Sequence, residues 1–113
     1  MVNLADLKCI PCQGGEPPLL ADEIQTFRPQ VADWEIVERE GIKRLERVFE
    51  FDDFAQALAF TNQVGALAER EGHHPAIVTE WGKVTVTWWT HKIKGLHQND
   101  FAMAAKTNRL MAW

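Results

Sequence analysis

Long apolar runs, clustered basic residues and cysteines are scarce in this sequence, and each shortage excludes a class of protein. No run approaches the roughly 18 apolar residues that a membrane-spanning helix requires, and the opening MVNLADLKCIPCQ is not typical of a secretory signal. We therefore expect a cytoplasmic protein. The net charge is -4 and the twelve Lys and Arg residues are dispersed. A nucleic-acid surface is disfavoured, because phosphate binding needs clustered positive charge.

The only two cysteines, Cys9 and Cys12, form one CxxC motif. A closed structural zinc site needs four ligands, and no second CxxC or nearby histidine supplies the other two. A redox motif would be expected after a strand, whereas this pair lies in a stretch that contains Pro and Gly. We interpret both cysteines as free thiols in a loosely packed segment, with a metal shared between subunits as the alternative.

With 113 residues, of which 46% are apolar and 25% charged, the chain has the size and composition of one globular domain. The glycine pair at 14–15 and the proline pair at 17–18 interrupt any regular element near the start. Residues 1–19 are therefore predicted to be an irregular leader, and residues 20–113 a single domain.

Apolar periodicity and turn residues predict three helices and two β-hairpins within that domain. The helices are expected at about 20–28, 53–72 and 97–113, and the strands at 34–39, 43–51, 75–81 and 83–90. The first helix should end near Arg28, because a residue that precedes a proline avoids helical angles. The order α-β-β-α-β-β-α predicts an α+β fold, a two-layer sandwich in which the helices pack on one face of a four-stranded antiparallel sheet.

All four histidines lie between residues 73 and 97. His73 and His74 are expected where the second helix ends, and His91 at the end of the neighbouring strand. Because antiparallel strands of similar length bring their outer ends together, these three imidazoles should converge. Asp100, in the first turn of the last helix, should join them at the same end of the sheet.

Three interpretations of this cluster are compatible with the spacing. The imidazoles could transfer protons near neutral pH, bind zinc or iron, or only complete a hydrogen-bond network. Adjacent side chains in an extended segment point in opposite directions, so His73 and His74 would not readily share one metal ion. Spacing alone favours proton transfer and leaves the other two open.

Three motifs then resemble the signature of the pterin-4a-carbinolamine dehydratases. They are EGHHP at 71–75, WGKVTVTWWTH at 81–91, and Gly95-Leu96 followed by Asp100, at matching separations. The similarity extends back through FDDFAQALAF at 51–60 to Trp34. The leader cysteine pair and the TEWGKVTVTWW run resemble most the bacterial members that accompany phenylalanine hydroxylase.

The resemblance implies an enzyme that dehydrates 4a-hydroxytetrahydrobiopterin to quinonoid dihydropterin and water, and so supports tetrahydropterin recycling for aromatic amino-acid hydroxylation. It implies acid–base catalysis by histidine with no cofactor and no metal. It also implies a homodimer or homotetramer and a functional link to phenylalanine hydroxylase. The alternative that the resemblance offers is an interaction or regulatory protein that acts on a transcription factor or on hydroxylase expression.

Carried over position by position, the resemblance assigns proton transfer chiefly to His73 and His91. His74 is implied to hold and orient the pterin while it shares the acid–base work. His97 lies outside the signature, and we interpret it as structural or surface-exposed.

Three further residues are implied to bind or orient within the same site. Glu69, one helical turn before His73, would hydrogen-bond the pterin amide edge. Thr90 would offer a backbone or hydroxyl contact, and Asp100 would orient His91 as a carboxylate partner.

Overall fold

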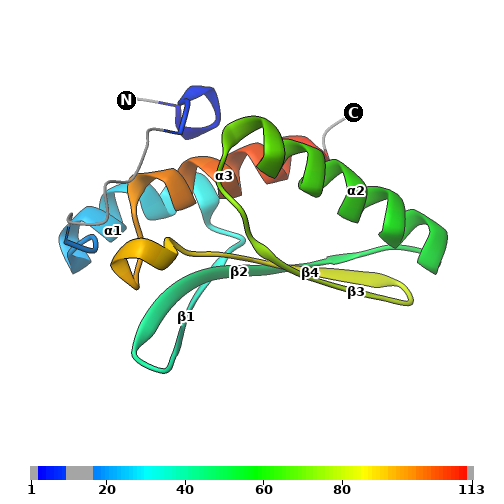
Figure 1. Ribbon diagram of the computed structural model, residues 1–113, viewed down its shortest axis with the longest axis horizontal. Helices are drawn as coiled ribbons and strands as arrows, with labels where there is room; N and C mark the ends of the chain where they lie inside the picture. Colours follow the sequence, from blue (N-terminus) through cyan, green and yellow to red (C-terminus); the bar gives the residue numbers. More distant parts are fainter. Residues whose placement is uncertain (1–2, 10–16, 112–113) are drawn as a thin grey trace.

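The computed structural model describes residues 3–9 and 17–111 of the chain and has the predicted α+β architecture. The helices lie together on one side of a four-stranded sheet (Figure 1). In chain order the elements are η1 (Leu4–Asp6), α1 (Ala21–Phe27), η2 (Arg28–Val31), β1 (Glu35–Arg39), β2 (Ile42–Glu50), α2 (Phe54–Glu71), β3 (Ala76–Glu80), β4 (Lys83–Trp88), η3 (His91–Ile93) and α3 (Gln98–Arg109), where η denotes a 3-10 helix.

The sheet has the strand order β1-β2-β4-β3, and every neighbouring pair is antiparallel. Each hairpin turns at a glycine in the left-handed region, Gly41 with φ 76° and Gly82 with φ 79°. Glycine suits these turns because it has no side chain to oppose a positive φ. In the centre of the sheet, β2 pairs with β4 in a register that sets Leu45 opposite Trp88.

The core lies between the sheet and the helices. Leu45 and Trp88 from the sheet, Phe101 from α3 and Trp34 from the segment before β1 are all fully buried. Because side chains alternate along a strand, only one face of the sheet contributes to this core. Among the residues that the structure describes, no helix covers the other face (Figure 1).

Helix α2 begins and ends at the residues that the sequence predicts. The Asp53 side chain accepts a hydrogen bond of 2.8 Å from the Gln56 backbone N–H, which satisfies one of the free donors of the first turn. At the other end Gly72 has φ 69°, the left-handed conformation that commonly ends a helix. His73 follows directly, so this cap determines where the chain leaves the helix toward β3.

Helix α1 ends at Phe27 with Arg28 as its C-cap, so the predicted end near Arg28 is confirmed, but the reason given for it is not. Arg28 is helical, with φ -52° and ψ -42°, and the chain continues through η2 past Pro29. The Arg28 guanidinium donates to the Val31 carbonyl at 3.1 Å, which holds this turn closed. The local disfavour of helical angles before proline is overcome by this contact and by the burial of Val31.

The predicted irregular leader contains a turn of 3-10 helix, η1, that packs on α3. Leu4 is fully buried, and its backbone N–H donates to the Gln30 side chain at 2.9 Å. Lys106 of α3 donates to the Ala5 carbonyl at 3.0 Å. The described part of the leader is therefore joined to the domain by burial and by hydrogen bonds. Within the described residues, no helix combines the length and the apolar character needed to cross a membrane.

Two glycines of one helix should respond in opposite directions to alanine. Gly65 lies inside α2 with open space around its Cα, so Gly65→Ala should raise the free energy of unfolding by about 0.5–1 kcal/mol. Gly72 has a positive φ, so Gly72→Ala should lower it by roughly 1 kcal/mol. Urea denaturation followed by circular dichroism measures both. A stabilised Gly72→Ala protein would contradict the left-handed cap.

Candidate active site

His73 is held at the end of α2 by a buried carboxylate. Its Nε2 lies 2.6 Å from Oδ1 of Asp100, and the exposed fractions of the two side chains are 13% and 0%. The His73 ring also stacks on Trp88, with the ring centroids 5.8 Å apart and the planes 8° from parallel. The imidazole is therefore fixed in position and orientation, and one edge still reaches the surface.

Asp100 receives hydrogen bonds from three separate elements. Besides His73, the Thr90 hydroxyl donates to Oδ2 at 2.7 Å, and the His97 backbone N–H donates to the same oxygen at 2.9 Å. An ionised carboxylate only accepts hydrogen bonds, so three converging donors fit it well. The end of α2, the residues after β4 and the start of α3 are all bonded to this group.

His97 is the N-cap of α3, in agreement with the structural role expected for it. Its ring Nδ1 accepts a hydrogen bond of 3.0 Å from the Asn99 backbone N–H. The imidazole thus takes the place of the oxygen that Ser, Thr, Asp or Asn supplies at many helix starts. Asp100, three residues later, completes a capping box with it.

His74 points away from His73 and forms a second pair. Its Nε2 lies 2.5 Å from Oε2 of Glu69 on the last turn of α2. Both side chains face solvent, with exposed fractions of 61% for His74 and 79% for Glu69. The opposite directions of the two adjacent histidines follow the alternation of an extended segment.

His91 occupies the first position of η3, beside the buried Thr90. The structure pairs Asp100 with His73 and not with His91, in contrast to the expectation from the sequence. The described contact of the His91 ring is with Trp89, with a centroid separation of 4.4 Å. Sequence reasoning did not identify this contact. The adjacent tryptophans at the end of β4 could have indicated it: successive side chains of a strand point to opposite faces, so with Trp88 in the core Trp89 lies on the other face.

Thr90 is oriented by contacts on all its polar groups. Its backbone forms a two-way bridge with Gly95, and its hydroxyl is used by Asp100. Thr90 is therefore buried with its hydroxyl directed at Asp100. Among the described residues, no three His, Cys, Asp or Glu side chains are close enough to share a metal ion.

The loop between β4 and α3 is pinned by the segment before α1. The Leu19 backbone N–H donates to the Leu96 carbonyl at 2.9 Å. A Cβ placed on Gly95 would lie 2.8 Å from the Cβ of Pro18, closer than side-chain atoms approach, so glycine is needed at this contact. The loop that carries His91 is thus clamped between the sheet and residues 17–20.

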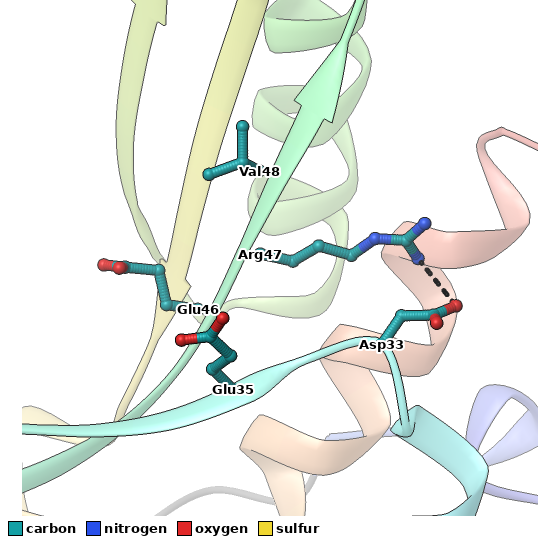
Figure 2. A pocket seen from close by; sticks show the side chains of 5 residues that line it. All are labelled: Asp33, Glu35, Glu46, Arg47 and Val48. Carbon is teal, nitrogen blue, oxygen red and sulfur yellow. Dashed lines mark ion pairs between the residues drawn. The ribbon is translucent and has the colours of Figure 1, made fainter.

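A pocket away from the histidines lies beside the start of β1 and the middle of β2, and Figure 2 shows the side chains that line it. They are Asp33, Glu35, Glu46, Arg47 and Val48. Its cation is already engaged, because Arg47 pairs with Asp33 at 3.6 Å and donates to the Asn108 side chain at 2.7 Å. The pocket offers no histidine, so we place the candidate active site at the histidine end of the sheet.

Comparisons with known sequences agree on one family. The sequence model described as Pterin 4 alpha carbinolamine dehydratase matches residues 17–110. A protein of Nitrosococcus oceani that bears the name pterin-4-alpha-carbinolamine dehydratase is 59% identical over 111 residues, 98% of each chain. One of Chlorobium limicola with the same name is 59% identical over 110 residues, 97% of each chain.

Two solved structures share the fold. One, described as a transcriptional coactivator/pterin dehydratase from Brucella melitensis, has a TM-score of 0.73 and 30% identity over 82% of this chain and 97% of its own. The other, described as a pterin dehydratase-like RuBisCO assembly factor in the alpha-carboxysome, has a TM-score of 0.59 and 26% identity over 71% and 90%.

Cys9 lies in the leader next to the end of α2. Burial of the thiol and the nearby Glu71 carboxylate raise the pKa of Cys9 to about 11. The Cys9 backbone N–H also donates to Glu71 at 3.4 Å. Its partner in the CxxC motif, Cys12, lies outside the described residues. A raised pKa leaves little thiolate at neutral pH, so Cys9 should be a poor nucleophile.

Alkylation of Cys9 tests this environment directly. In a Cys12→Ser variant at pH 8, folded Cys9 should react with iodoacetamide about 100-fold more slowly than in the same chain in denaturant, because the thiolate fraction falls tenfold per pKa unit. The rate should rise with pH up to about 11. Mass spectrometry of timed samples measures it. Equal rates in the folded and denatured chain at pH 8 would contradict the buried, acid-flanked thiol.

Proposed function

Because the chain belongs to the pterin-4a-carbinolamine dehydratase family, we propose that it removes water from a 4a-hydroxytetrahydropterin to give the quinonoid dihydropterin. The observation within this chain that carries the proposal is the contact between the buried Asp100 and the partly exposed His73 ring. A buried carboxylate that orients a partly exposed imidazole is an arrangement suited to proton transfer.

The reaction needs two proton movements and no change of oxidation state. The C4a–O bond breaks as the departing hydroxyl gains a proton and leaves as water. The N5 lone pair forms the C4a=N5 double bond, and N5 loses its proton to a base. An imidazole with an ordinary pKa near ~6.5 can give or take a proton at neutral pH, so histidines can serve both steps.

We assign these proton transfers to His73 and His91. His73 is the more firmly held, by Asp100 on one ring nitrogen and by Trp88 on one ring face. With Nε2 directed at Asp100, its Nδ1 is the nitrogen left for the pterin. His91 would complete the pair from the end of β4, where its exposed ring is accessible to substrate.

His74 and Glu69 are assigned to binding. Their contact at the surface sets a ring and a carboxylate side by side, and a pterin presents an amide edge that both could hydrogen-bond. His74 would also share in the acid–base work. Thr90 and Asp100 would act without touching the substrate, since their polar groups are engaged inside the protein.

In the cell we propose that this activity recycles tetrahydropterin for an aromatic amino-acid hydroxylase, with phenylalanine hydroxylase as the functional partner. We also propose that the protein acts as a homodimer or homotetramer. The sheet has two edge strands, β1 and β3, and pairing between copies would satisfy the unpaired backbone groups of one of them.

An interaction role is the second candidate function. It is favoured by the Brucella structure, which is described as both a transcriptional coactivator and a pterin dehydratase. Val48 and Val78 also lie half-exposed on the sheet face without helices, in one row across β2, β4 and β3. A folded variant without His73 and His91 separates the two roles, because partner binding should survive where dehydration does not.

The purified protein should accelerate dehydration of chemically generated 4a-hydroxytetrahydropterin, measured by the absorbance of the quinonoid product. Treatment with a strong chelator should leave the rate unchanged, because side chains alone are proposed to move the protons. A rate equal to buffer alone would refute the proposed function. A rate that vanishes with the chelator and returns with zinc or iron would replace proton transfer by metal catalysis.

Substitutions should distinguish the proposed catalytic roles of His73 and His91 from the structural role of His97 as a helix cap. His73→Ala and His91→Ala should each lower kcat by at least about 10²-fold, since general acid–base groups typically contribute ~10² to 10⁴. His97→Asn keeps an N-cap acceptor and should retain the wild-type kcat. Steady-state kinetics, with circular dichroism to verify folding, measure all three. Wild-type rates in both alanine variants would remove this cluster from the chemistry.

A further inference from the structure

Trp89 contacts two side chains, Arg44 and His91, and the three together form the Arg44–Trp89–His91 stack. The Arg44 guanidinium carbon is 4.2 Å from the centroid of the indole, and the His91 ring centroid is 4.4 Å from the Trp89 ring at a tilt of 38°. Both distances are those of direct contact between a ring and a cation or a second ring. The Trp89 indole is therefore in contact with the cation of Arg44 and with His91, which is proposed to transfer a proton.

The sheet register accounts for the first contact. Leu45 of β2 pairs with Trp88, the last residue of β4. Continued by one residue beyond the strand, the same register would set Arg44 opposite Trp89. Leu45 and Trp88 are in the core, and alternation turns their neighbours to the face without helices. Arg44 thus meets Trp89 on the opposite side of the sheet from the contact of His73 with Trp88.

Arg44 is itself held in place on this face. It donates to the Arg39 carbonyl at 3.4 Å, and its guanidinium lies over the indole. Among the described residues its buried Nε has no hydrogen-bond partner. Arg39 is fixed by two bonds to Glu46, at 2.8 and 3.0 Å, and Glu46 accepts from Thr87 at 2.9 Å. The Arg39 hydrogen bond lowers the pKa of Glu46.

This layer belongs to the face away from α3. Figure 2 shows Glu46 and Arg47 on opposite sides of β2, with Arg47 directed toward Asp33 and Glu46 away from it. Arg44 has the same strand parity as Glu46. The hydrogen-bonded layer therefore extends from β1 across β2 and ends at the indole that contacts His91.

His91 requires such support because the carboxylate that would otherwise orient it is occupied. Both oxygens of Asp100 are engaged, one by His73 and the other by Thr90 and His97. An exposed imidazole with two free side-chain torsions would sample several orientations, and proton transfer depends on a defined one. The ring of Trp89 restricts these orientations by contact with one face.

We propose that Trp89 is a positioning residue for His91 and that Arg44 fixes the indole in the orientation that this requires. The proposal rests on the proposed function for its kinetic consequence, and on the Arg44–Trp89–His91 stack for its geometry. Trp89 contributes no proton and no substrate hydrogen bond. Its effect is to restrict the His91 ring, so it should act on kcat more than on KM.

Kinetics of matched variants test the proposal. Trp89→Leu keeps apolar bulk and removes the aromatic face, and should lower kcat by about tenfold with KM nearly unchanged, as expected for loss of alignment. Trp89→Phe should restore most of the loss, because a ring is again present. The control is Trp81→Leu at the exposed β3–β4 turn, which should keep wild-type kcat. A wild-type kcat in Trp89→Leu would overturn the proposal.

A double-mutant cycle separates positioning from a general structural effect. If Trp89 acts through His91, Trp89→Leu should cause no further loss of kcat in a His91→Ala background. A loss by the same factor in both backgrounds would show that Trp89 acts elsewhere, and would refute the proposal. Arg44→Met, which keeps an apolar side chain but removes the guanidinium, should lower kcat in the same direction as Trp89→Leu and by a smaller factor.

Nuclear magnetic resonance can detect the contact between Trp89 and His91 independently of enzyme activity. Protons of the His91 ring close to the indole should be shifted upfield in the wild type, and should move downfield in Trp89→Leu but not in Trp81→Leu. An inactive wild-type protein with this shift would refute the proposed function and leave the stack standing. An active protein in which the His91 signals do not respond to Trp89→Leu would refute the positioning role alone.

Discussion

A carboxylate that is removed from water is stable only where donors surround it, and the histidine end of this protein is arranged around one such group, Asp100. Its three donors are His73 just after α2, Thr90 after β4 and the backbone of His97, the N-cap of α3. Each buried hydrogen bond left unmade would cost roughly 1–3 kcal/mol. The end of α2, the end of β4 and the start of α3 are therefore held close together around Asp100, and His73 lies at this junction.

Much of the fold could be predicted because the residues that end its helices and turn its hairpins are recognisable from the local sequence. Glycines at positive φ mark both hairpins and the end of α2, the Asp53 side chain marks its start, and alternation along β4 separates core from surface. The predicted α+β order is confirmed, and the family match over residues 17–110 confirms the resemblance stated from HHP and its companion motifs. The first helix ends near Arg28 as predicted, but Arg28 itself keeps helical angles before Pro29, because its contact with the Val31 carbonyl and the burial of Val31 outweigh the local preference.

The partners within the candidate site were less predictable. Spacing brought Asp100 to the same end of the sheet as the histidines, but could not tell which ring it would meet. That choice depends on the alternation at His73 and His74 and on the exact start of α3, which is set by the His97 cap. The sequence also could not tell which tryptophan would contact which histidine. Trp88 stacks on His73 on the core side of the sheet, and Trp89 contacts His91 on the other side. The roles proposed for these residues remain predictions for kinetics to decide.

The clamp between Leu19 and the β4–α3 loop has a consequence for the order in which the protein is made. Leu19 meets Leu96, so closing this contact joins positions separated by most of the described chain. Long-range contacts form slowly, because the entropy of closing a large loop opposes them until other contacts are in place. A nascent chain can assemble both hairpins and α2 from neighbouring segments. The loop that carries His91 can be clamped only after residues near both ends have been synthesised and brought together, so maturation of the site should lag behind formation of the sheet.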